Sequence, residues 1–169
     1  MIVNRQNKVR IDNHAIGDFV RRLQKCLRLG RWNFNICFVG DREMARLNAS
    51  YRGKAKPTDV LSFPWSSPAE GRLTMSADSP RPRATGGWRT KATNFERSGM
   101  FPEISNFLGD IVISAETARR NSLGEGHSTP NEIRWLILHG VLHLLGYDHA
   151  SDHGEMTTLE VSLRARLGI

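Results

Sequence analysis

The sequence predicts an α+β fold: a single domain with a mixed four-stranded sheet covered by about five helices. Short runs of strand-forming residues and segments with helical spacing of apolar residues follow one another along the chain. Their order is strand, helix, strand, helix, two strands and three helices, which lacks the strict alternation of a parallel α/β sheet. The 169 residues are enough for one domain with its own core and too few for two domains of usual size.

The first half of the chain begins with a short strand expected at residues 2–4. Apolar residues at helical spacing then predict a helix that Asp12 or Asn13 can cap and that Gly30 can end. The next apolar run, FNICFV, is rich in strand formers. Asp41 is a plausible N-cap of the helix that follows it.

The second half predicts two further strands, at residues 60–65 and 108–114. Pro64 marks the end of the first of them or an edge position. Ser114 can cap the short helix that comes after the second.

The clearest helix start in the chain is Thr129-Pro130-Asn131-Glu132, which matches a capping box with proline at the first helical position. This helix contains the apolar run IRWLILHGVLHLL and is expected to stop at Gly146. A last helix is expected after Ser151, with its apolar residues on one face.

Residues 66–100 show no hydrophobic period and are rich in Ser, Pro, Gly and Arg. A loop of this length without secondary structure is uncommon in a compact domain. We therefore expect a single domain over residues 1–169 that carries a flexible basic insertion. Its tryptophan, Trp88, and its basic side chains could contact RNA, although a tolerated surface insertion is the simpler interpretation.

The formal net charge of +7 is spread unevenly. Residues 1–65 carry 13 lysines and arginines against 5 acidic residues, whereas residues 101–169 carry 5 against 9. A basic field attracts polyanions such as nucleic acid, and a solvated basic surface without a partner is the alternative. No apolar run approaches the ~18 residues of a membrane span, and the N-terminus lacks the apolar core of a signal peptide. We expect a cytoplasmic protein that does not enter a membrane.

The stretch HGVLHLLGYDH at residues 139–149 is the strongest functional signal. His139 and His143 are about one helical turn apart on one face, the spacing at which two imidazoles can share a metal ion. Gly146 can turn the chain back and bring His149 toward them. Three nitrogen ligands with an open position describe a catalytic zinc site, and zinc suits imidazole best, although other divalent transition metals could take the same ligands.

Other residues of the same kind are weaker candidates. Asp148 can orient a ligand or be a plain turn residue, with both interpretations open. His153 could approach the metal, but exposure on the first turn of the last helix is the simpler expectation. His14 and His127 carry no signal and are expected to be exposed.

The motif departs from the H-E-x-x-H pattern of zinc proteases because Gly140 stands where that pattern has its general base. Protonating a peptide leaving group normally needs an acid–base partner, whereas a phosphodiester mainly needs neutralisation of charge on its phosphoryl oxygens. An arginine serves that need, and Arg52, Lys54 and Lys56 stand just before a predicted strand. Each of these cations alone is more often a solvated surface charge.

Three blocks in this order, LNASYRGKAKPTDVLSFPW, LGDIVIS and HGVLHLLGYDH, resemble the YbeY family of metal-dependent endoribonucleases. The resemblance covers most of the chain and extends into the last helix with Glu155, Met156 and Glu160. The glycine after the first histidine belongs to the family's pattern. Residues near 72–99 are extra relative to that pattern and leave the metal motif intact.

The resemblance implies that His139, His143 and His149 bind one zinc ion, and that Arg52 acts in catalysis together with His139. It implies cleavage of single-stranded RNA, a role in 3′-end maturation of small-subunit ribosomal RNA and ribosome quality control, and contact with the ribosome or its assembly factors. Two alternatives stay open. One is a non-catalytic ribosome-assembly factor with structural zinc, and the other is a zinc peptidase or amidohydrolase, against which the missing glutamate and the basic charge both argue.

Overall fold

The computed structural model describes residues 1–65, 106–147 and 154–169. Its elements are β1 (Ile2–Asn4), α1 (Asn13–Cys26), β2 (Asn33–Val39), α2 (Asp41–Arg52), β3 (Val60–Pro64), β4 (Phe107–Ser114), α3 (Ala115–Gly124), α4 (Thr129–Leu144) and α5 (Glu155–Leu167). This order confirms the predicted α+β class. The expected insertion at residues 66–100 lies outside the described residues, so that part of the domain description stays a prediction.

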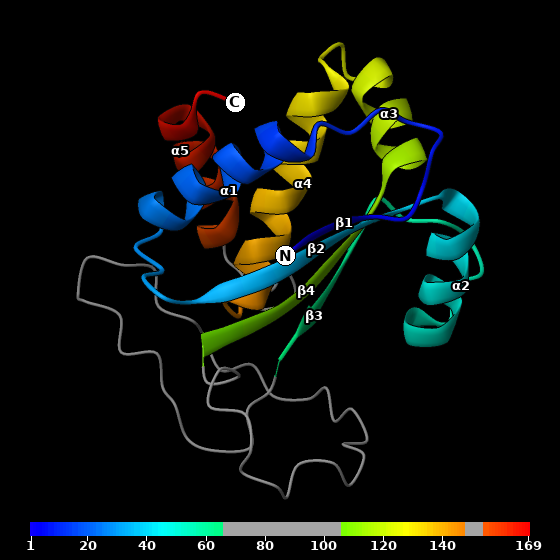
Figure 1. Cartoon of the computed structure of the whole chain (residues 1–169), viewed down its shortest axis with the longest axis horizontal. Helices are drawn as coiled ribbons and strands as arrows, with labels where there is room; N and C mark the ends of the chain where they lie inside the picture. The colour runs from blue at the N-terminus through cyan, green and yellow to red at the C-terminus, as the bar shows by residue number, and fades with distance from the viewer. Residues whose placement is uncertain (66–105, 148–153) are drawn as a thin grey trace, which may run out of the picture.

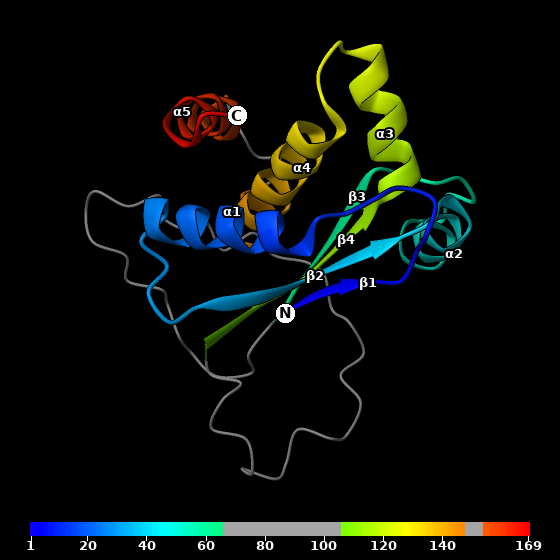
Figure 2. The same cartoon turned by 45° about the horizontal axis from the view of Figure 1, so that its top comes forward.

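The sheet has the strand order β1-β2-β4-β3. Strands β1, β2 and β4 run parallel, and the edge strand β3 pairs with β4 in the antiparallel direction. Figure 1 shows α1, α4 and α5 together on one side of the sheet and α2 beside one end of it, and the turned view in Figure 2 keeps that separation. The sheet is therefore mixed, as expected, and its two faces are covered by different helices.

Each face of the sheet has its own apolar cluster because successive side chains of a strand point to opposite faces. Ile36 and Ile111 belong to the main core, which also contains the buried residues of α1, α4 and α5. Val39 and Leu61 point the other way and form a smaller core with Met44 of α2. Helices α4 and α2 thus pack on opposite faces of the same sheet.

Two helix starts differ from the sequence-based expectation, and α2 is the first. Its N-cap is Gly40, and Asp41 is already the first helical residue. The Asp41 carboxylate accepts hydrogen bonds from Ser114 (2.6 Å) and from Arg120 (2.6 Å) instead of capping its own helix. The prediction was wrong because partners on α3 and at the end of β4 hold this carboxylate.

Helix α4 likewise begins one residue away from the expected cap. Ser128, not Thr129, is the N-cap, and its hydroxyl accepts a hydrogen bond from the backbone N–H of Asn131. Glu132 does not reach back to the cap but pairs with His127 at 2.8 Å. Helix α4 is mostly buried along its length.

No helix within the described ranges is long and apolar enough to cross a bilayer.

Candidate metal site

Helix α4 carries two of the predicted metal ligands on a side that is only half-buried. The side chains of His139 and His143 emerge from a helix whose remaining C-terminal residues are almost all buried. Their Nε2 atoms lie 3.0 Å apart, and the two rings meet edge-on with centroids 4.6 Å apart. The structure therefore brings these two histidines together, as the four-residue spacing predicts.

The second nitrogen of each ring is held by an acceptor. The Nδ1 atom of His143 lies 2.8 Å from the carbonyl oxygen of Tyr147, in the turn that follows the helix. The Nδ1 atom of His139 lies 3.2 Å from a carboxylate oxygen of Glu160 on α5. A carbonyl can only accept and an ionised carboxylate can only accept, so each Nδ1 atom carries the hydrogen.

This tautomer leaves the Nε2 atoms of two neutral rings facing each other as acceptors. Two acceptors at 3.0 Å repel unless a cation lies between or beside them. Ligating histidines in proteins typically hold Nδ1–H on a carboxylate or carbonyl in this way, with Nε2 on the metal. The donor set of His139 and His143 therefore fits a zinc ion.

The expected third ligand, His149, lies outside the described residues, as do Asp148 and His153. Gly146 has a φ of +89°, a left-handed conformation that suits glycine and that ends the helix as expected. The ligand role of His149 stays a prediction.

Glu160 is a site residue for which the sequence pattern gave no role. It is buried, with one carboxylate oxygen on His139 and the other on Arg164. Burial alone raises the pKa of Glu160, but the hydrogen bond from His139 and the Arg164 guanidinium together hold that pKa below its ordinary value. The carboxylate is thus kept ionised beside the candidate metal ligand.

Arg164 is in turn fixed by an aromatic ring of α4. Its guanidinium carbon lies 4.1 Å from the ring centroid of Trp135, within the range of a cation–π contact. Helices α4 and α5 therefore hold the orienting carboxylate from both sides, so that the position of His139 depends on how the two helices pack.

Gly140 explains why no glutamate follows the first histidine. A Cβ atom on this residue would lie 2.9 Å from Cγ2 of Ile111 and 3.2 Å from Oγ of Ser62. The Ser62 hydroxyl also lies 3.3 Å from the Gly140 carbonyl oxygen. At the position where zinc proteases carry their general base, the backbone of α4 packs directly against the sheet and leaves no space for a side chain.

Arg52 lies apart from the two histidines. It is the last residue of α2, exposed, and forms no ion pair or side-chain hydrogen bond with any residue that the structure describes. Arg52 belongs to α2 and the histidine pair to α4, two helices that pack on opposite faces of the sheet. Lys54 and Lys56 are also exposed, in the loop that leads to that strand.

One group of possible metal ligands in the described ranges was not expected from the sequence. Carboxylate or ring atoms of Glu125, His127 and Glu132 lie within 4.8 Å of one another. His127 is half-buried against the Trp135 ring (4.2 Å between centroids) rather than exposed, which corrects that expectation. Its contact with the buried Glu132 already accounts for this arrangement as an ion pair at the start of α4.

Comparison with known proteins gives one consistent result. A family model described as Endoribonuclease YbeY matches residues 1–168. A protein of Solibacter usitatus named Endoribonuclease YbeY is 37% identical over 155 residues, which are 92% of this chain and 79% of that protein. A protein of the same name from Syntrophus aciditrophicus is 35% identical over 159 residues, with the same coverage of both chains.

The fold also has a solved counterpart. The solution structure of TM1509 from Thermotoga maritima superposes with a TM-score of 0.57, covering 99% of this chain and 89% of that one. The sequence identity in that comparison is 20%, so it supports the fold alone.

Proposed function

Because this chain belongs to the YbeY family, we propose that it is a zinc-dependent endoribonuclease that cuts single-stranded RNA. Its relatives carry the name endoribonuclease, and its basic charge suits a polyanionic substrate. We further infer a role in the cytoplasm, in 3′-end maturation of small-subunit ribosomal RNA and ribosome quality control, in contact with the ribosome or its assembly factors.

One observation carries the metal dependence: the two Nε2 atoms that meet at 3.0 Å while both Nδ1 atoms are held. We assign His139, His143 and His149 as the ligands. When bound, zinc would supply Lewis-acid activation of the attacking oxygen or of the phosphodiester.

The chain's own residues orient the ligating rings and bind the substrate. Glu160 and the Tyr147 carbonyl hold the two rings in the tautomer that offers Nε2. Arg52 is assigned to bind a phosphoryl oxygen, because a guanidinium donates two parallel hydrogen bonds to such a group. Gly140 offers no carboxylate for protonating an amine, which favours a phosphodiester over a peptide as substrate.

The test is cleavage of a labelled single-stranded RNA taken from the 3′ region of small-subunit ribosomal RNA. His139→Ala should lose both bound zinc and cleavage, because it removes one Nε2 ligand. Arg52→Glu should lower the cleavage rate by roughly 100-fold or more while zinc content and fold are kept.

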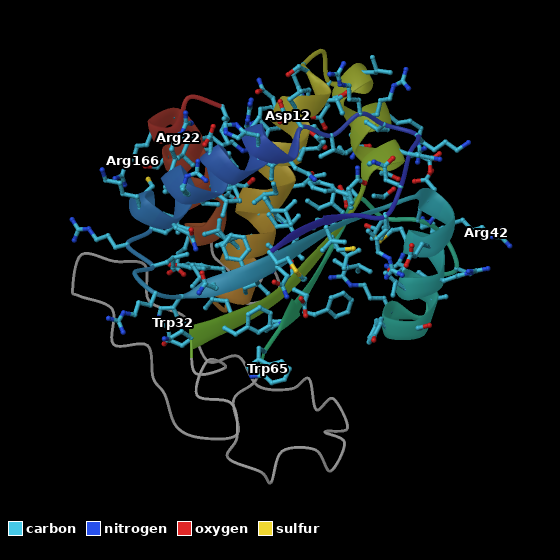
Figure 3. All side chains as sticks on the ribbon, in the orientation of Figure 1. Asp12, Arg22, Trp32, Arg42, Trp65 and Arg166 are labelled. Atoms are coloured by element: carbon cyan, nitrogen blue, oxygen red, sulfur yellow. The ribbon has the colours of Figure 1, made fainter. Side chains whose placement is uncertain are left out.

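Arg42→Glu is the matched control for the arginine. It makes the same change in charge on an exposed residue at the other end of α2 (Figure 3), and it should cleave as the wild type does. RNA cleavage that survives in metal-stripped protein would contradict the proposal. Cleavage of a peptide library, inhibited by a chelator, would instead support the peptidase alternative.

A further inference from the structure

A row of aromatic rings lies on the sheet face opposite to the histidine pair. Phe63 of β3 meets the ring of Tyr51 on α2, with centroids 4.8 Å apart and planes at 65°. Trp65, just after β3, meets the ring of Phe107 at 6.0 Å and 63°. We call these four residues the aromatic row.

Strand register places the row on the face that bears α2. Phe63 pairs with Asp110, and Asp110 pairs with Asn35 of β2, whose amide donates to the Asp110 carboxylate at 2.9 Å. Phe107 pairs with Asn33, two residues from Asn35 on β2, and the register of β4 shifts by one residue between this pair and the next. The ring contact with Trp65 places Phe107 on the same side as the row. Figure 3 shows Trp65 on the side of the sheet away from α1.

Two of the four rings in the row are exposed, those of Tyr51 and Trp65, whereas Phe63 and Phe107 are half-buried. Tyr51 keeps 55% of its surface accessible and Trp65 keeps 45%. Among the described residues, α2 covers the part of this face around Val39, Met44 and Leu61, and Phe63 packs against that cluster. Exposed aromatic residues grouped on one face mark an interaction surface more often than isolated ones do.

Positive charges lie at one end of the row. Arg52 directly follows Tyr51, and Lys54 and Lys56 come next in the loop after α2. The side-chain amide of Asn48 on α2 donates a hydrogen bond to the backbone carbonyl of Lys56 and holds this loop against the helix. All three cations are exposed. The Asp110 carboxylate lies in the middle of the face and would repel phosphate groups there. The phosphates of a bound ligand therefore fit the cationic end, and its uncharged bases fit the aromatic row.

The row is also close to the candidate metal site, across one strand. Ser62 faces α4 and touches Gly140, the neighbour of His139, whereas Phe63 faces the opposite way. A chain molecule that passes around the outer edge of β3 can therefore reach both faces.

We propose that the aromatic row stacks the bases of single-stranded RNA next to the cleavage site, an inference that rests on the proposed function. Exposed rings beside cations are the means by which proteins hold unpaired bases, because every base offers a π-face and each phosphate a negative charge. A duplex keeps its bases stacked inside and cannot use such a row. The aromatic row therefore gives the enzyme a higher affinity for single-stranded RNA than for duplex RNA.

The experiment measures binding of a fluorescent single-stranded RNA octamer to the metal-stripped full-length protein, so that cleavage does not interfere. Trp65→Ala and Tyr51→Ala should each weaken binding by about 5-fold or more, the effect of losing one stacked base. Trp65→Phe should restore most of the affinity because it keeps a ring. An abasic octamer of the same charge should bind the wild type and Trp65→Ala equally.

Val161→Ala and Leu123→Ala are the controls, since both remove an exposed apolar side chain away from the row, on α5 and α3. Thermal melting checks that each variant is folded. If Trp65→Ala and Tyr51→Ala bind the octamer as tightly as the wild type, the inference is wrong, whatever the cleavage assay shows. If the wild type fails to cleave RNA but these variants lose binding, the proposed function fails and the binding surface stands.

Discussion

Gly140 lies where helix α4 touches the sheet, and its missing side chain is a packing requirement. A Cβ atom would lie 2.9 Å from Cγ2 of Ile111, which is fully buried. Gly140→Ala should therefore lower the free energy of unfolding by about 1–3 kcal/mol, the usual cost of overpacking a core, despite the better helix propensity of alanine. Gly140→Glu should cost more, because it also places a carboxylate in this contact.

The matched control is Gly17, also inside a helix. A Cβ atom there meets only the end of Arg21, at 3.7 Å. Gly17→Ala should be neutral or stabilising by up to ~1 kcal/mol. Urea denaturation of both variants measures the difference, and a Gly140→Ala protein as stable as Gly17→Ala would refute the packing argument.

Glu160 holds Nδ1 of His139 and would act on a bound metal ion through that ring, so we treat it as a positioning residue. Glu160→Gln keeps the shape but can present its amide nitrogen to Nδ1, which removes the charge that fixes the tautomer. Zinc affinity, measured with a competing chromophoric chelator, should fall by about 10- to 100-fold. Glu43 on α2, which pairs with Arg5, serves as the control, and Glu43→Gln should bind zinc normally. Unchanged affinity in Glu160→Gln would remove Glu160 from the site.

At the scale of elements, spacing predicted the type and order of every described helix and strand, but not how their ends are held. The Asp41 carboxylate matched a helix cap in the sequence, yet it bonds to Ser114 and Arg120, more than 70 residues away. His139 and Glu160 are 21 residues apart on different helices, and His127 is half-buried by a tryptophan. These contacts depend on tertiary packing, which residue spacing does not contain.

The contacts of Asp41 tie α2 to α3 and make this junction sensitive to pH. Burial raises the pKa of Asp41, but the hydrogen bonds from Arg120, Ser114 and Thr117 outweigh burial and hold the pKa below its ordinary value. A carboxyl group with a lowered pKa in the folded state stabilises the fold above its unfolded pKa, and this contribution is lost as the pH falls through the folded pKa.

Asp41→Asn should therefore lower the free energy of unfolding by about 1–2 kcal/mol at pH 7. The gap between variant and wild type should begin to narrow as the pH falls below about 4, where the carboxyl of the unfolded chain becomes protonated, and it should vanish only below the lower pKa of the folded state. Urea denaturation at pH 7, 5 and 3.5 measures this gap. A gap that stays constant over the whole range would show that the lost interaction is not ionic.

For the whole molecule, the main core joins α1, α4 and α5 to the sheet through buried apolar residues. Zinc should therefore add stability only by binding the folded state, by about 2.7 kcal/mol at a free concentration 100 times its Kd. In a chain of this size that corresponds to a rise in Tm of about 5–10 °C. A chelator should reverse the rise and leave the far-ultraviolet circular dichroism at 25 °C unchanged. His139→Ala should show no zinc-dependent shift. A domain that unfolds at 25 °C when zinc is removed would instead have the ion as part of its fold, as a non-catalytic assembly factor with structural zinc requires.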